Sequence, residues 1–244
     1  MTFENLNLIP SILKAVEDQN YTEPTSIQEK AIPLVLNHED VLGSAQTGTG
    51  KTAAFAIPII QHMVNDQDSA HGKRKVKALV VTPTRELAIQ IGESFTAYAK
   101  YAQIKNTVVF GGVKQGSQVD AVRRGVDVLV ATPGRLLDLM NQGHISLNDI
   151  KYFVLDEADR MLDMGFIHDI KKIIAKLPKQ RQSLFFSATM PQNIVDLSRQ
   201  ILRDPKKIAV DAVSSTAETI QQYLYKTNKS DKPGLLLHII KDPE

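Results

Sequence analysis

Residues 41–52 read VLGSAQTGTGKT, a short apolar run followed by a glycine-bearing loop that ends in lysine and threonine. Glycine at positions 48 and 50 lets the main chain curl tightly, so that successive N–H groups point at one anion. The helix expected after the loop directs its positive end to the same place. Lys51 would then bind the β and γ phosphates of a nucleotide, and the Thr52 hydroxyl would bind Mg²⁺.

The loop departs from the common pattern G-x-x-x-x-G-K-[ST] at its first position, where the sequence has Ala45. Residues 48–53 also fit G-x-G-x-x-A, a dinucleotide pattern that requires an acidic residue about 20 positions further on. The next apolar run, Ala78–Thr82, leads into Pro83 and Thr84 instead. A triphosphate site is therefore favoured over a dinucleotide site, and a glycine-rich turn without a ligand is the third alternative.

The composition limits the remaining classes of function. A chain of 244 residues with 43% hydrophobic content can form one large α/β domain, or one domain and part of another. The net charge of +2 is nearly balanced, so any binding of nucleic acid must come from local patches. The absence of cysteine excludes disulfides and thiolate metal sites. No leader or bilayer-spanning run is visible, and we expect a cytoplasmic protein.

Short runs rich in valine, isoleucine and leucine alternate with amphipathic stretches. The runs are continuous rather than alternating in polarity, which is typical of a parallel sheet covered on both faces. The strand candidates are Val41–Ser44, Ala78–Thr82, Thr107–Phe110, Val126–Ala131, Tyr152–Leu155, Ser183–Phe186 and Ile208–Val210. This order predicts an α/β fold with a doubly wound parallel sheet of about seven strands.

Most of the strand candidates are followed directly by a compact polar or glycine-bearing cluster. After the first strand comes the glycine-rich loop, and the later clusters are Pro83-Thr84-Arg85-Glu86-Leu87, Gly111-Gly112, Thr132-Pro133-Gly134-Arg135, Asp156-Glu157-Ala158-Asp159 and Ser187-Ala188-Thr189. Loops after strands are polar in many proteins. Because the carboxyl ends of parallel strands share one edge, however, six such clusters predict a single functional edge of the sheet.

The acidic cluster has a specific use beside a phosphate-binding loop. One carboxylate holds Mg²⁺, partly through water, and a neighbour orients the attacking water; we assign the first role to Asp156 and the second to Glu157. Asp159 is expected to contact the hydroxyls of Ser187 and Thr189, linking the phosphate site to the next strand. A solvated acidic loop is the alternative.

The end of the chain differs from the rest. Residues 211–219 are expected to form a linker, Ile220–Tyr225 a strand and Lys232–Ile240 a helix. Two elements cannot bury a core of their own. We therefore predict a first domain over residues 1–210 and the start of a second domain over residues 220–244.

Taken together, these motifs resemble the amino-terminal RecA-like, P-loop domain of DEAD-box RNA helicases of the bacterial type. Residues 156–159 spell DEAD, and the loop Ala45-Gln46-Thr47-Gly48-Thr49-Gly50-Lys51-Thr52 is similar to the family's own phosphate loop, Ala45 included. The resemblance covers residues 1 to about 210 and implies an RNA-dependent ATPase that uses ATP and Mg²⁺. It implies a catalytic set of Lys51, Asp156, Glu157, Asp159, Ser187 and Thr189, with Thr52 and Asp156 at the metal.

The segment Tyr21–Gln28, with Phe3 upstream, resembles the family's adenine-sensing element. The carboxamide of Gln28 has a donor and an acceptor that complement adenine N7 and the N6 amino group, whereas guanine presents acceptors at both positions. ATP should therefore be favoured over GTP. Stacking by Tyr21 or Phe3 would add contact without choosing the base. From its sequence context alone, Gln28 could also face solvent on a helix after Pro24.

The resemblance also implies a surface for one RNA strand, made by Pro83, Thr84, Arg85, Gly111, Gly112, Thr132, Pro133, Gly134 and Arg135. Small residues admit the RNA backbone, helix N-termini receive phosphates, and hydroxyls can meet the 2′-OH. Nothing suggests readout of base edges, so binding should not depend on RNA sequence. Arg135 in a structural salt bridge is the alternative, and the run Lys73–Lys77 favours a solvated loop over an RNA groove.

In such a fold, hydrolysis occurs between two RecA-like domains, and the arginine motif that stabilises the transferring phosphoryl belongs to the second domain. We therefore expect this chain alone to bind ATP or ADP weakly, without efficient hydrolysis or RNA unwinding. Two other classes stay open: a nucleotide-dependent binding module without catalysis, and a DNA translocase or small-molecule kinase. A kinase would have no need of Gln28 or of Thr132–Arg135.

Overall fold

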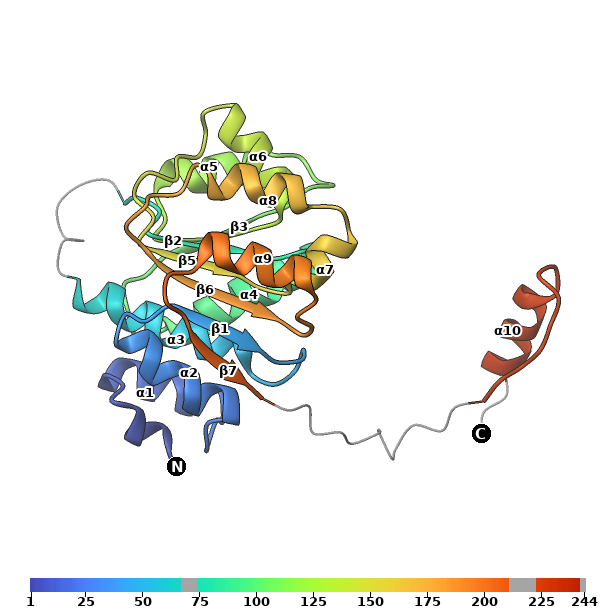
Figure 1. The fold of residues 1–244 in the computed structure, drawn as a ribbon, viewed down its shortest axis with the longest axis horizontal. Coiled ribbons are helices and arrows are strands. Elements are labelled where there is room, and N and C mark those ends of the chain that lie inside the picture. Colours follow the sequence, from blue (N-terminus) through green and yellow to red (C-terminus); the bar gives the residue numbers. More distant parts are fainter. Residues whose placement is uncertain (67–73, 211–222, 242–244) are drawn as a thin grey trace. The chain divides into compact units, whose positions relative to one another are not determined.

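A computed structural model describes residues 1–66, 74–210 and 223–241. The chain divides into two compact units, Met1–Asp211 and Ala212–Glu244. The first unit is a seven-stranded sheet with helices on both faces (Figure 1). All strand pairings in it are parallel, which confirms the doubly wound α/β fold.

The sheet has the order β3-β4-β2-β5-β6-β1-β7. Its strands are β1 (Val41–Ser44), β2 (Ala78–Val81), β3 (Asn106–Val109), β4 (Val128–Ala131), β5 (Tyr152–Leu155), β6 (Gln182–Ser187) and β7 (Lys206–Ala209). Each corresponds to a predicted strand, with ends that differ by at most two residues. The continuous apolar runs were informative because β2, β4, β5 and β6 are buried along their whole length.

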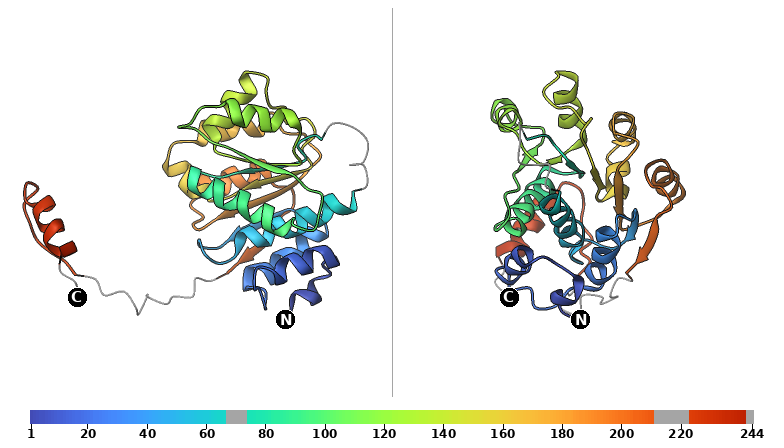
Figure 2. Two further views of the ribbon diagram at one scale, coloured as in Figure 1. Left: turned by 180° about the vertical axis from the view of Figure 1, so that it is seen from behind. Right: turned by 90° about the vertical axis from the view of Figure 1, so that its left-hand side faces the viewer.

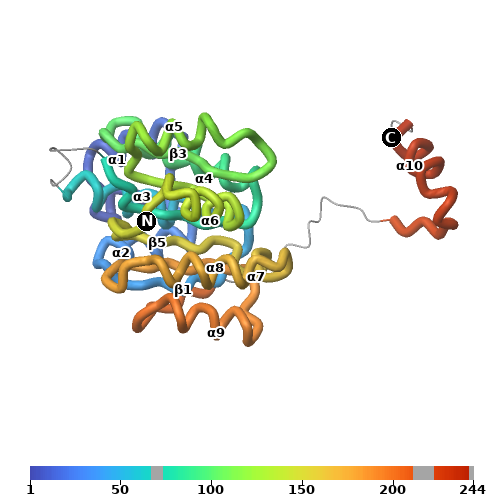
Figure 3. The backbone as a smooth tube through the Cα atoms, turned by 90° about the horizontal axis from the view of Figure 1, so that it is seen from above, coloured from blue at the N-terminus to red at the C-terminus, as the bar shows by residue number. Residues whose placement is uncertain are grey.

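Side chains of successive strand residues point to opposite faces and enter two separate cores. In β2, Val80 belongs to one core, and Leu79 and Val81 belong to the other. The first core is covered by η1 (Phe3–Leu6), α1 (Pro10–Glu17), α2 (Ser26–Leu36), α3 (Lys51–Asn65) and α4 (Arg85–Tyr98). The second is covered by α5 (Gly116–Arg124), α6 (Pro133–Asn141), α7 (Ala158–Asp163), α8 (Ile167–Ile174) and α9 (Gln192–Ile201). Figure 2 shows the sheet between the two groups, and in Figure 3 α3 and α9 lie on opposite sides of it.

Helix α3 is the central helix of the first core. Its residues 53–63 are buried all round the helix, as expected for a helix without a polar face. Phe55 packs against Phe95 of α4 and Phe186 of β6, with ring centroids 6.3 and 5.7 Å apart. This packing fixes the first residue of the helix, Lys51, at the carboxyl edge of the sheet.

Parallel pairing brings the carboxyl ends of all seven strands to one edge, and the strand order divides this edge into two halves. Strands β5, β6 and β1 are neighbours and lead into the acidic cluster, Ser187–Thr189 and the glycine-rich loop. Strands β3, β4 and β2 are neighbours in the other half and lead into the remaining three clusters.

The second unit contains helix α10 (Lys232–Lys241), which corresponds to the predicted helix. The predicted strand is not observed in the part of it that is described, since residues 223–225 form no strand. A strand needs a neighbouring strand for its backbone hydrogen bonds, and the described residues of this unit offer none. Residues 220–222 and the predicted linker, residues 211–219, lie outside the described residues.

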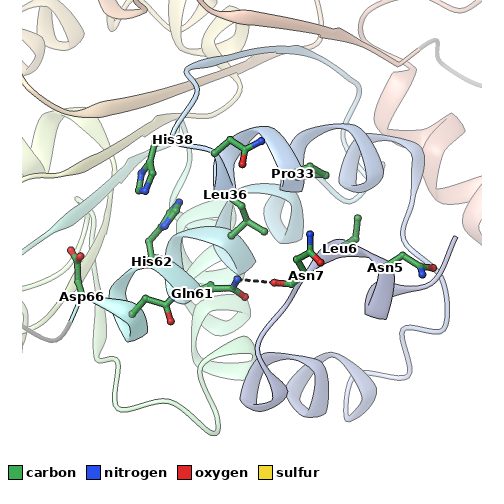
Figure 4. Close-up of a pocket in the computed structure, with 11 residues that line it drawn as sticks. Asn5, Leu6, Asn7, Pro33, Leu36, His38, Gln61, His62 and Asp66 are labelled. Atoms are coloured by element: carbon green, nitrogen blue, oxygen red, sulfur yellow. Dashed lines mark hydrogen bonds between the residues drawn. The ribbon is translucent and has the colours of Figure 1, made fainter.

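At the opposite, amino edge of the sheet, the imidazole of His62 is enclosed beside a small pocket (Figure 4). Its Nε2 donates a hydrogen bond to the Val35 carbonyl at 2.9 Å. Its ring stacks on His38, with centroids 4.0 Å apart, and on Tyr152, with centroids 5.5 Å apart. Burial lowers the pKa of His62, and the nearby His38 acts in the same direction, although the Val35 carbonyl and Asp66 oppose it.

We expect the free energy of unfolding to fall as the pH drops below 6.5, the ordinary histidine pKa, because the unfolded chain then takes up a proton that folded His62 resists. For one proton the change is at most about 1.4 kcal/mol per pH unit. The variant His62→Gln can keep the donor to Val35 but does not titrate. Urea denaturation of both proteins at about pH 7.5 and about pH 5.5 measures the difference.

Asp40 and Asp156, whose pKa values burial raises, oppose this trend but are present in both proteins. The comparison of the two proteins therefore isolates the contribution of His62 to the pH dependence of the free energy of unfolding. The same loss of stability on acidification in wild type and variant would show that His62 does not carry it.

Candidate functional site at the carboxyl edge of the sheet

The glycine-rich loop takes a backbone shape that only glycine adopts without strain. Gly48 and Gly50 have φ values of +85° and +92°, in the left-handed region. Gly50 immediately precedes α3 and forms its N-cap. A Cβ atom at Gly50 would overlap Nε2 of Gln28, so a side chain here would displace the Gln28 carboxamide from the loop.

The first side chain of α3 is a buried cation. Lys51 is only 6% exposed, and its Nζ lies 3.5 Å from Oδ1 of Asp156. Among the described residues, this Nζ has no hydrogen-bond partner. A buried ammonium needs acceptors for three protons. The residues present therefore fit a polyphosphate, whose oxygens would supply those acceptors between the loop N–H groups and Asp156.

Asp156 and Glu157 follow β5, as the sequence indicated, and both are buried. Burial raises the pKa of Asp156; the Lys51 ammonium lowers it, and the Glu157 carboxylate raises it further. Glu157 has φ +53°, a left-handed backbone that costs a non-glycine residue energy. Its Oε1 accepts a hydrogen bond from Oγ1 of Thr47 at 2.9 Å, so the acidic cluster and the glycine-rich loop are in direct contact.

Asp159 connects the acidic cluster to the end of β6. Its Oδ2 accepts hydrogen bonds from the backbone N–H and the hydroxyl of Thr189, at 2.8 and 2.9 Å. The backbone N–H of Asp159 donates to the Ser187 hydroxyl at 3.1 Å. Burial alone would raise the pKa of Asp159, but the bonds from Thr189 and its other partners hold it below the ordinary value.

Gln28 is buried against the loop rather than facing solvent, with 4% of its surface exposed. Its Oε1 accepts from the backbone N–H of Thr25 at 3.0 Å, and its Nε2 donates to the Gly50 carbonyl at 3.2 Å. The Thr25 hydroxyl donates to the Thr49 carbonyl at 2.8 Å. Each half of the carboxamide has capacity for one more hydrogen bond. Gln28 can therefore hold the loop and contact a base at the same time.

The two aromatic candidates near this point have different surroundings. Tyr21 is 40% exposed, whereas Phe3 is 4% exposed and lies in the first core. Their rings stack with centroids 6.4 Å apart, and the Tyr21 hydroxyl shares a hydrogen bond with Tyr98 at 3.2 Å. Tyr21 is thus the ring available to a ligand, and Phe3 supports it from behind.

In the other half of the edge, the clusters that follow β2, β3 and β4 contact one another. The Thr84 hydroxyl caps α4 by accepting a hydrogen bond from the backbone N–H of Leu87 at 3.3 Å, directly after Pro83. The Arg85 guanidinium lies over the Phe110 ring, 4.9 Å from its centroid. The following Gly111-Gly112 has open space at both Cβ positions, and Gly112 has φ +79°.

The cluster after β4 opens α6, with Thr132 at the N-cap and Pro133 in the first helical position. Arg135 donates from Nη2 to the Val113 carbonyl at 2.9 Å, and its Nε lies 3.7 Å from Asp138. The salt bridge considered from the sequence is therefore present. It ties this cluster to the loop after β3, so that the three clusters form one surface.

Several contacts were not found from the sequence. The role of Thr25 had a signal, since Thr25-Ser26-Ile27-Gln28 has the spacing of a capping box. The bond between Thr47 and Glu157 had none, because the two residues are 110 positions apart. In the described part of the basic run, Arg74 pairs with Asp127 and Lys75 pairs with Asp149.

The fold and this edge define a P-loop nucleotide-binding domain. Comparison with known proteins then gives the family: residues 25–197 match the model of the DEAD/DEAH box helicase family. The chain belongs to this family, which confirms the resemblance seen in the sequence.

Relatives from several organisms agree with this assignment. The chain is 42% identical over 98% of its length to the DEAD-box ATP-dependent RNA helicase CshA of Geobacillus kaustophilus, covering 50% of that protein. It is also 42% identical over 98% of its length to RhpA of Helicobacter pylori, covering 47% of that protein. A crystal structure of a hypothetical ATP-dependent RNA helicase from Sulfolobus tokodaii matches 82% of this chain and 56% of that one, with 38% identity and a TM-score of 0.74. The chain thus spans about half the length of the two curated relatives.

The backbone geometry predicts different outcomes for two glycine substitutions, one in the loop and one in α6. Gly50→Ala should lower the free energy of unfolding by about 1–2 kcal/mol, because alanine is strained at this φ and its Cβ displaces Gln28. Gly134→Ala is the matched control, since its Cβ meets open space in the first turn of α6; it should be neutral or stabilising by up to about 1 kcal/mol. Chemical denaturation measures both, and equal effects would contradict the geometry.

Proposed function

We propose that this chain is the ATP-binding domain of an ATP-dependent RNA helicase, in which nucleotide binding and hydrolysis drive the separation of RNA strands. The observation that carries the proposal is the buried Lys51 ammonium, which has Asp156 at 3.5 Å and no hydrogen-bond partner among the described residues. Family membership and the names of the relatives support the assignment to RNA helicases.

The roles of the nucleotide-binding residues follow from their positions. The N–H groups of residues 45–52 would surround the phosphates, with Lys51 on the β and γ phosphates. Thr52 and Asp156 would hold Mg²⁺, which supplies positive charge to the transferring phosphoryl. The described residues contain no cluster of three or more metal-binding side chains, consistent with an ion that keeps most of its waters and shares the phosphates.

Glu157 would orient the attacking water. Its carboxylate is now engaged by the Thr47 hydroxyl and, at 3.3 Å, by Arg160. A nucleotide seated in the loop would compete for Thr47, which leaves the carboxylate free to accept from water. Asp159 is hydrogen-bonded to Thr189 and Ser187, and it would transmit a shift of the acidic cluster on nucleotide binding to the end of β6.

Base selection would come from the free capacity of Gln28. The second lone pair of its Oε1 suits the adenine N6 amino group, and the second proton of its Nε2 suits N7. Because the same side chain bonds to Gly50 and Thr25, binding of adenine would also stiffen the phosphate loop. Tyr21 would stack on the base without distinguishing adenine from guanine.

We further propose that the surface made by the clusters after β2, β3 and β4 binds one RNA strand without sequence preference, through its phosphates and 2′-OH groups. It adjoins the nucleotide half of the edge because β2 pairs with β5. A second RecA-like domain, begun by residues 220–244, would close over both.

No helix among the described residues is long and apolar enough to cross a bilayer. The cytoplasmic location remains a prediction.

The role of Glu157 is tested in the full-length protein by Glu157→Gln. We expect RNA-stimulated ATP hydrolysis to fall by about a hundredfold or more, because an amide oxygen can accept a hydrogen bond from the attacking water but is too weakly basic to take its proton. The affinity for ATP and for RNA should change by less than about threefold, since neither contact depends on the carboxylate charge. Glu93→Gln, an exposed change on α4, serves as control. Normal turnover in the Glu157 variant would remove the residue from its proposed role.

A further inference from the structure

Strand β3 is one of the two edge strands of the sheet, and a hollow of about 470 Å³ lies at its amino end. The hollow is formed where α4 and α5, which cover opposite faces of the sheet, both end beside this strand. Ala99, Ile104 and Val126 contribute apolar surface to its lining. This hollow lies at the edge of the sheet opposite to the nucleotide-binding residues.

Three cations line the hollow, each from a different segment. Lys100 follows α4, Lys105 precedes β3, and Arg124 is the last residue of α5. No acidic side chain is among the lining residues. Lys100 pairs with Asp18, whereas Lys105 and Arg124 have no ion-pair partner in the described parts of the chain. Because all three cations are exposed around one concave surface, the hollow attracts anions.

The hollow and the proposed RNA surface lie at the two ends of the same strand. Gly111-Gly112 follows the carboxyl end of β3, and Lys105 precedes its amino end. At about 3.3 Å per residue, the six steps from Lys105 to Gly111 span about 20 Å. At a rise of about 3.4 Å per nucleotide, as in a stacked strand, that distance corresponds to about six nucleotides.

We propose that an RNA strand held at Gly111-Gly112 continues along the outer edge of β3, and that Lys105 and Arg124 bind its phosphates in the hollow. The proposal rests on the RNA binding proposed above. Contacts of this kind do not depend on sequence; they raise the affinity for longer strands and make it more sensitive to salt.

A structural explanation accounts for part of the cluster. Arg124 is the last residue of α5 and Lys100 directly follows the C-cap of α4, where a cation offsets the partial negative charge of the helix. Lys105 lies outside both helices and gains nothing from this effect. If the cations only stabilised the helix ends, their removal would lower the free energy of unfolding but would not change how the affinity depends on RNA length.

The test uses the 244-residue chain with oligouridylates of about six and about fourteen nucleotides, followed by fluorescence anisotropy between about 50 and 200 mM salt. The double variant Lys105→Glu/Arg124→Glu should bind the longer strand about tenfold more weakly than wild type, with a salt slope reduced by about two. Its affinity for the short strand should change by less than about twofold.

Lys171→Glu/Lys172→Glu on α8 makes the same change in net charge at exposed residues away from β3 and should leave both affinities nearly unchanged. Lys105→Gln/Arg124→Gln provides a second, less disruptive pair, and thermal unfolding of every variant checks the fold. The proposal is supported if the longer strand no longer binds more tightly than the shorter one in either variant of Lys105 and Arg124, while the α8 control keeps this difference in affinity.

The inference is overturned if the variants of Lys105 and Arg124 still bind the longer strand more tightly than the shorter one, or if the α8 control loses this difference equally. Binding of the short strand would in that case still support the RNA surface. If wild type bound neither strand even at low salt, the RNA surface itself would be wrong, and the inference would fall with it.

Discussion

The buried contact between the Lys51 ammonium and the Asp156 carboxylate is the constraint around which the carboxyl edge is organised. It joins the start of α3 to the end of β5 across 3.5 Å, and both side chains are almost fully enclosed. A buried ion pair of this length, whose Nζ has no hydrogen-bond partner among the described residues, is weak evidence of a stabilising role, because desolvation offsets the attraction. Such a pair is better explained as a prepared binding site. The close packing of α3 around Phe55 holds the ammonium in place.

Other contacts make the phosphate loop sensitive to its neighbours. Gln28 and Thr25 hold it from α2, and Glu157 holds it through Thr47. Thr47 and Glu157 are groups that a nucleotide and its attacking water would also use, whereas Gln28 has free capacity for a base while it keeps its bonds to the loop. Binding would therefore break the bond between Thr47 and Glu157 and leave the contacts from α2 in place. Since β2 and β5 are adjacent, the half of the edge that we propose for RNA lies next to the nucleotide half.

Much of this arrangement could be predicted from the sequence because it depends on local patterns. Continuous apolar runs gave all seven strands, and parallel pairing placed their polar ends on one edge. Features set by tertiary contact were not accessible: the left-handed backbone of Glu157, the burial of Phe3 behind Tyr21 and the bond between Thr47 and Glu157. The strand expected at residues 220–225 was wrong in its described part, because strand propensity needs a partner strand.

Calorimetric titration of the chain with ATP and Mg²⁺, compared with Lys51→Met, measures whether the buried ammonium binds the phosphates. We expect one site that prefers ATP to GTP and whose affinity falls by about 30- to 150-fold in the variant, since a charged hydrogen bond to phosphate contributes about 2–3 kcal/mol. A circular dichroism spectrum matched to wild type would show that the variant is folded. Undiminished binding of ATP by folded Lys51→Met would show that the buried ammonium is not the phosphate-binding group.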